Sequence, residues 1–100
     1  MDDLLITAYV AYFRMHPEDR EGLKFLEVDP AIGPMACLTE DVGKRWVAWL
    51  RTDPAWTSRP IARRLSRQMQ RLDQATPAAQ CRFQTALRHA IAQLDFGEDR

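Results

Sequence analysis

The side chains that most often bind metals or attack substrates are few in this 100-residue chain and stand far apart. No two His or Cys residues have the spacing of zinc ligands, which are commonly separated by two to four residues. They occur at His16, Cys37, Cys81 and His89. We therefore expect no metal and no other cofactor, and we expect the two cysteines to be buried, reduced thiols. Whether one disulfide joins them is left open by the sequence.

Catalytic patterns are also missing from the sequence. Nucleophilic catalysis needs a Cys or Ser beside a His and an orienting acid, and the spacing of these residues singles out no such set. The glycines Gly22, Gly33, Gly43 and Gly97 do not form a glycine-rich loop of the kind that binds phosphates. We predict no catalytic residues and a protein that is not an enzyme.

Charge is the property of the sequence that points to function. Acidic and basic residues are equal in number, 14 of each, yet residues 1–43 carry a net charge of −6 and residues 44–100 a net charge of +6. Twelve of the basic residues are arginine, a bias typical of a GC-rich bacterial or phage genome. Such asymmetry between the two halves of a chain favours a charged partner.

Five arginines collect on one face of a helix predicted from Ser58 to about Gln74. On a wheel of 3.6 residues per turn, the apolar side chains fall within about a quarter turn. Arg63, Arg67 and Arg71 lie roughly opposite, Arg59 continues their row and Arg64 flanks it. The apolar residues are Ile61, Leu65, Met69 and Leu72; the arginines, called here the arginine surface, are Arg59, Arg63, Arg64, Arg67 and Arg71. Because a guanidinium forms two parallel hydrogen bonds to a carboxylate or a phosphate, we predict that this surface binds an anionic partner.

Two interpretations of the arginine surface stay open. In the first, it is a solvated face or is neutralised by acids of the same chain, such as Glu18, Asp19, Glu21 and Glu40. In the second, it docks on an acidic protein surface or on nucleic acid. Trp56 stands in the polar connection before the arginines. It either plugs the end of the fold or is an exposed anchor of the partner-binding site.

The first of the elements that must position these residues is a helix over residues 4–15. This segment is apolar except for Thr7 and Arg14, yet it is too short to span a membrane. Acidic Asp2 and Asp3 precede it, which excludes a signal peptide and predicts a cytoplasmic protein. A helix that is apolar nearly all round is either central in the core or partly covered by a partner. If a partner covers this helix, a homodimer formed through it is the arrangement to examine.

Prolines and capping residues set the bounds of the other predicted helices. Pro17 is predicted to begin a second helix that reaches Asp29, and residues 30–38 are predicted to be a loop. Thr39 is the expected N-cap of a third helix, which ends at residues 53–54. Thr76 is the expected N-cap of a fifth helix, with Gly97 at its C-terminal end.

No segment alternates as a strand would, so the predicted fold class is all-α. Residues 1–100 are expected to form a single domain, a compact bundle of about five helices. The third and fourth helices do not match a helix-turn-helix well. Residues 53–58 form a connection of about six residues without glycine, where that motif has three to four, often with glycine.

Two stretches resemble a known family. The segment from Leu38-Thr39 through Trp46, followed by Ala62-Arg63-Arg64-Leu65-Ser66, is similar to the helical core-binding region of tyrosine recombinases. The likeness covers about a third of the chain, and the catalytic domain of that family has no counterpart in the sequence. What the resemblance implies is limited to DNA binding.

These observations lead to one main hypothesis and one alternative. The main hypothesis is a small non-enzymatic bacterial or phage interaction protein. It binds and regulates or inhibits a partner through the arginine surface, which recognises an acidic protein patch. The alternative is a nucleic-acid-binding module that contacts phosphates with the same arginines. No membrane partner is expected.

Overall fold

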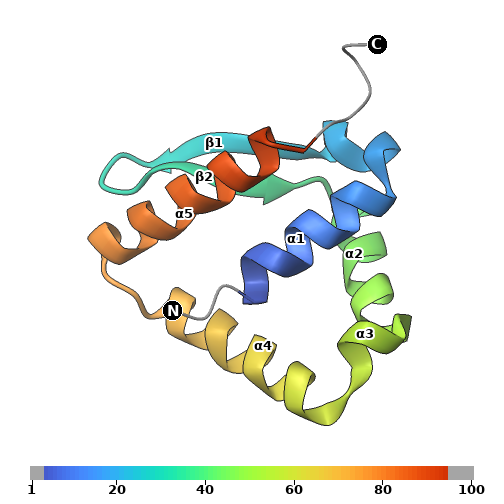
Figure 1. Cartoon of the computed structure of the whole chain (residues 1–100). Helices are drawn as coiled ribbons and strands as arrows, with labels where there is room; N and C mark the ends of the chain where they lie inside the picture. The colour runs from blue at the N-terminus through green and yellow to red at the C-terminus, as the bar shows by residue number, and fades with distance from the viewer. Residues whose placement is uncertain (1–3, 95–100) are drawn as a thin grey trace.

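The computed structural model describes residues 4–94 and consists mostly of helices, with one small antiparallel β-hairpin (Figure 1). In chain order the elements are α1 (Leu4–Met15), a 3₁₀ helix η1 (Pro17–Gly22), β1 (Leu23–Asp29), β2 (Gly33–Leu38), α2 (Glu40–Thr52), α3 (Pro54–Thr57), α4 (Arg59–Asp73) and α5 (Pro77–Ala92). The all-α prediction is therefore wrong, because residues 23–38 form two paired strands.

The correction concerns two predicted elements, the second helix and the loop that was expected to follow it. Helical structure after Pro17 ends at Gly22, and Leu23 then continues in extended conformation. The chain then turns between Asp29 and Gly33, so residues 33–38 of the predicted loop pair with β1 as the second strand. The Asp29 carboxylate accepts a hydrogen bond from the Ala31 N–H (3.0 Å), and Gly33 has a φ of 90°, which glycine adopts readily.

The hairpin is held in place by α5, which lies along β2 (Figure 1). Phe25 of β1 is opposite Ala36 of β2, and the register shifts between Glu27 and Asp29. The Ala36 N–H points away from β1 and donates to the side-chain oxygen of buried Gln84 in α5 (2.9 Å). A side chain 48 residues away in the sequence thus accepts the hydrogen bond of a backbone N–H at the outer edge of β2.

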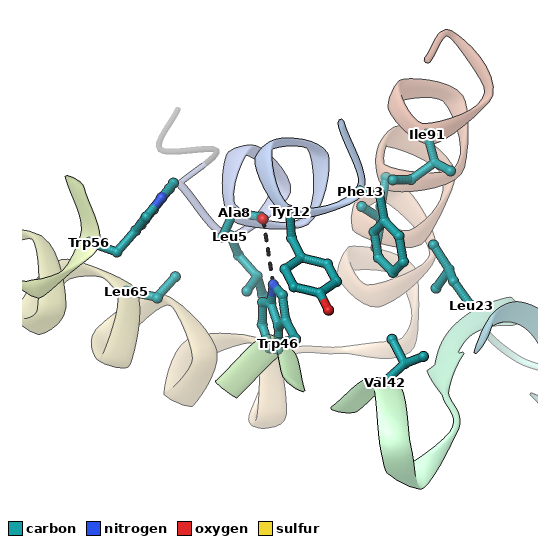
Figure 2. Packing of buried hydrophobic residues seen from close by; sticks show 11 residues of the cluster. Leu5, Ala8, Tyr12, Phe13, Leu23, Val42, Trp46, Trp56, Leu65 and Ile91 are labelled. Carbon is teal, nitrogen blue, oxygen red and sulfur yellow. Dashed lines mark hydrogen bonds between the residues drawn. The ribbon is translucent and has the colours of Figure 1, made fainter. Parts of the chain in front are cut away.

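The first helix is central in the core, as one of its two interpretations required. Figure 1 shows α1 in the middle of the fold, and it contacts η1, α2, α4 and α5. Its buried residues are Leu5, Ala8, Tyr12 and Phe13 (Figure 2). Trp46 of α2 stacks on Tyr9 with ring centroids 4.7 Å apart, and its indole N–H donates to the Ala8 carbonyl (3.5 Å). Its own chain therefore covers this side of α1, whereas Met15 at the end of the helix is 60% exposed.

Two predicted helix caps are confirmed. The Thr39 hydroxyl accepts from the Val42 N–H (3.3 Å) at the start of α2, and the Thr76 hydroxyl accepts from the Ala79 N–H (3.2 Å) at the start of α5. Ser58 precedes α4 without a side-chain capping bond. The predicted C-terminal role of Gly97 lies outside the described residues. Within residues 4–94, no helix combines the length and apolarity needed to cross a membrane.

Candidate functional site

The arginine surface lies on α4, and all five of its arginines are exposed. The opposite face of α4 packs on the rest of the fold through buried Leu65 and half-buried Ile61 and Leu72. The side chain of Gln68 accepts from the Leu5 N–H (2.6 Å), which fixes α4 against the start of α1. The sequence thus placed the basic and apolar faces of this helix correctly, except that Met69 is 41% exposed.

Three of the four acids named as possible partners of the arginine surface have other neighbours. Asp19 pairs with Arg45, Glu40 with Lys44 (3.2 Å), and Glu18 lies 3.5 Å from His16. Among the residues that the structure describes, no carboxylate forms an ion pair with the four arginines spaced four residues apart. These are Arg59, Arg63, Arg67 and Arg71. In this part of the chain their charge is directed to solvent.

Trp56 does not belong to the exposed surface. It is 8% exposed, and its ring centroid lies 5.8 Å from that of Trp49. The one-turn helix α3 holds it there, with the Asp53 carboxylate accepting from the Ala55 N–H (2.9 Å). Trp56 therefore plugs the end of the fold, and the prediction of an exposed anchor is corrected.

A groove between α2 and α4 adjoins the arginine surface, and the sequence did not indicate it. It has a volume of about 350 Å³. Its apolar walls include Val47 and Leu50 of α2 and Met69 of α4, and Arg51 contributes a charge. A larger, shallower depression of about 630 Å³ continues along α2 and shares Val47 and Arg51 with the groove. The two lie next to each other along α2, and Glu40 and Lys44 also line the larger one.

A polar cluster that the sequence did not indicate joins η1 to α1 and α2. Asp19 is 8% exposed, and its two carboxylate oxygens accept from Nε (3.1 Å) and Nη2 (2.8 Å) of Arg45. The Tyr12 hydroxyl also donates to this carboxylate. The hydrogen bonds from Arg45 and then from Tyr12 lower the pKa of Asp19.

Burial, followed by the hydrogen bond to Asp19, raises the pKa of Tyr12 to about 12. The carboxylate is therefore ionised and the phenol protonated near neutral pH, so neither side chain exchanges protons there. The cluster acts as a clamp that fixes η1 against the helices.

The ligand-type residues are scattered in the structure as well as in the sequence. Cys37 is half-buried and Cys81 is exposed, and both are free thiols. The expectation that both cysteines are buried is therefore wrong. Within residues 4–94, no three His, Cys, Asp or Glu side chains are grouped closely enough to hold a metal ion.

No protein family, curated protein or solved structure matches the chain.

Proposed function

We propose that the chain is a small non-enzymatic bacterial or phage interaction protein that acts in the cytoplasm and binds an acidic protein surface through its arginine surface. Binding regulates or inhibits the partner. The observation that carries this proposal is the exposure of the arginine surface, four of whose members form no ion pair with a described carboxylate. From Arg59 to Arg71 the row extends about 18 Å, since an α-helix rises about 1.5 Å per residue.

The apolar groove beside the arginine surface favours a protein partner over nucleic acid. Protein interfaces combine an apolar centre with arginines and a polar rim, whereas nucleic-acid interfaces are more polar and much more basic. Val47 and Met69, at 39% and 41% exposed, supply the apolar part of such an interface next to α4.

A nucleic-acid-binding function is the second candidate. It is favoured by the uniform sign of the arginine surface, because Asp73, the single acid of α4, lies at its C-terminal end. A guanidinium binds phosphate as well as carboxylate, so both candidates use the same residues and must be separated by their ligands.

Binding of polyglutamate and of a generic DNA duplex, each at two salt concentrations, tests both candidates. The variant Arg63→Glu/Arg67→Glu reverses two charges of the arginine surface. Lys24→Glu/Arg82→Glu makes the same change in net charge at exposed positions on β1 and α5 and is the matched control. We expect polyglutamate to bind at low salt, the first variant to weaken it at least tenfold, and the control to change it less than threefold.

The outcomes separate the candidates. Tight duplex binding that falls steeply with salt and is lost in the Arg63→Glu/Arg67→Glu variant would replace the protein-binding proposal by the nucleic-acid one. Failure of both probes to bind at low salt would reject both functions.

A further inference from the structure

The groove between α2 and α4 has a floor made by the core itself. Trp46, Trp56 and Leu65 line it, and each of them is buried (Figure 2). Figure 1 shows that α2 and α4 are joined at α3, so the groove lies at the side of this joint. Its volume of about 350 Å³ is within the range of clefts that bind ligands, about 300–1,000 Å³.

The length of the two neighbouring depressions suits a short helix. Beyond the groove, the larger depression follows α2 from Gly43 to Arg51, a distance of about 12 Å at 1.5 Å per residue. Val47, in the middle of this stretch, is 39% exposed, and Met69 across the groove is 41% exposed. Two turns of an incoming helix have this length and present apolar side chains at positions i, i+3 or i+4, and i+7 on one face.

The charges beside the groove are positive. Arg51 lines it from α2, and Ser66 lines it from α4. At 100° per residue, Arg59 and Arg63 lie within about 60° of Ser66 around the axis of α4, on the side away from Met69. None of these three arginines forms an ion pair with a carboxylate in the described part of the chain. An occupant with acids flanking its apolar face would complement them.

We propose that this groove binds an amphipathic helix of the partner protein, with apolar side chains on the floor and acidic side chains against Arg51, Arg59 and Arg63. The proposal rests on the function proposed above and deepens it by naming the class of partner. A helix satisfies its own backbone hydrogen bonds, which an extended peptide over an apolar floor bounded by two helices cannot do.

A second copy of the chain does not have the required helix among its described residues. The helices α1 and α5 contain no acidic residue, and α4 contains one, Asp73. The acids of α2, Glu40 and Asp41, are both in its first turn. Because residues 4–94 of a second copy supply no such helix, the occupant that we propose is a different protein.

The test uses a phage library of random 14-residue peptides built on a helix-forming scaffold, selected against the full chain. Synthetic copies of the selected peptides are then titrated by fluorescence polarisation. Met69→Glu introduces a carboxylate into the groove. Thr85→Glu makes the same change in charge at an exposed position on α5, outside the groove and the arginine surface, and is the control. Ser66→Trp fills the groove from an exposed position and replaces Met69→Glu if that variant unfolds.

We expect the selected peptides to carry apolar residues at helical spacing with acids beside them. Met69→Glu or Ser66→Trp should weaken their binding at least tenfold, and Thr85→Glu less than threefold. A selection without binders, binders without this pattern, or binding unaffected by the groove variants would overturn the inference. If polyglutamate still depends on Arg63 and Arg67 in that case, the proposed function stands and the groove inference alone fails.

Discussion

Replacing Gly22 with Ala is expected to destabilise the fold through steric overlap. Gly22 is buried where η1 passes into β1, and its carbonyl accepts from the Thr39 N–H (2.8 Å). An added Cβ would overlap Val42 Cγ2 and lie 2.9 Å from both Val42 Cβ and Thr39 Oγ1. Its φ is not positive, so alanine meets no backbone strain at this position.

The magnitude follows from the atoms that must move. Val42 is buried and β-branched in a helix, so its side chain has little freedom to rotate away. Overpacking of this kind costs about 1–3 kcal/mol. Displacing the Thr39 hydroxyl also weakens its capping bond to the Val42 N–H, which adds up to about 1 kcal/mol. The sum is a loss of about 1–4 kcal/mol in the free energy of unfolding.

Urea unfolding followed by circular dichroism measures this loss, with two other glycines as controls. Gly43 lies inside α2, and its nearest neighbour for an added Cβ is Leu38 Cβ at 3.8 Å. Gly43→Ala should therefore stabilise the protein by about 0.5–1 kcal/mol. Gly33 has open space around it but a φ of 90°, so Gly33→Ala should cost about 1–2 kcal/mol through backbone strain.

The order of the three variants is the critical result. A Gly22→Ala protein as stable as the wild type would refute the close approach of η1 to the start of α2. In a Val42→Ala background the contact with Cγ2 is absent, so Gly22→Ala should lower the free energy of unfolding by less than it does in the wild type. The two changes should therefore not be additive in a double-mutant cycle.

The remaining predictions concern single hydrogen bonds, and urea unfolding measures each of them. Asp19→Asn weakens its bonds with Arg45 and should cost about 1–3 kcal/mol. Because folding lowers the pKa of Asp19, its contribution is complete above the unfolded value of about 3.9 and is lost as the pH falls through the folded value. The wild type should therefore lose stability below about pH 4 more steeply than Asp19→Asn, and parallel pH curves would contradict the clamp. Gln84→Leu leaves the Ala36 N–H without its acceptor and should cost about 1–3 kcal/mol, whereas an unchanged stability would mean that α5 does not satisfy this edge. Thr76→Ala removes a helix cap and should cost about 1 kcal/mol, with Thr85→Ala, an exposed change inside α5, as its control.

The four longer helices, α1, α2, α4 and α5, were predictable from sequence because their ends and faces are encoded locally. The hydroxyls of Thr39 and Thr76 each accept a hydrogen bond from the backbone N–H three residues later, in the first turn of the helix that follows. The arginine surface was predictable for the same reason, since residues of one helix share a face whatever the rest of the chain does.

The hairpin was missed because its stability comes from distant residues. Leu23 and Phe25 lie on the inner side of β1, but Leu26 and Val28 are also apolar and are 52% and 68% exposed, which hides the alternation of a strand. A two-stranded sheet is marginal alone. Here the supporting contact comes from Gln84 of α5, and no local pattern indicates it.

The same limit applies to the groove and to the clamp. Asp19 and Arg45 are 26 residues apart, and the walls of the groove come from two helices whose separation depends on the packing of Trp56. The sequence predicts only a connection over residues 53–58, whereas Asp53 caps a helical turn within them. The burial of Trp56 in that turn could not be read from its position in the sequence.

The two outer edges of the hairpin differ in what they can bind. On β2, the Ala36 N–H is bonded to Gln84, and Pro34 has no N–H to offer. Within residues 4–94, β1 has no second strand beside it. Strand addition, whether by a peptide or by an aggregating chain, can therefore begin at β1 and not at β2.

The open edge of β1 carries its own protection. Lys24, Glu27 and Asp29 place charges along it, and the register shift between Glu27 and Asp29 breaks the straight line of backbone groups that a new strand would need. Exposed Leu26 and Val28 are thus flanked by residues that oppose sheet growth. The charges and the register shift therefore oppose strand addition at β1, the edge of the hairpin that is open.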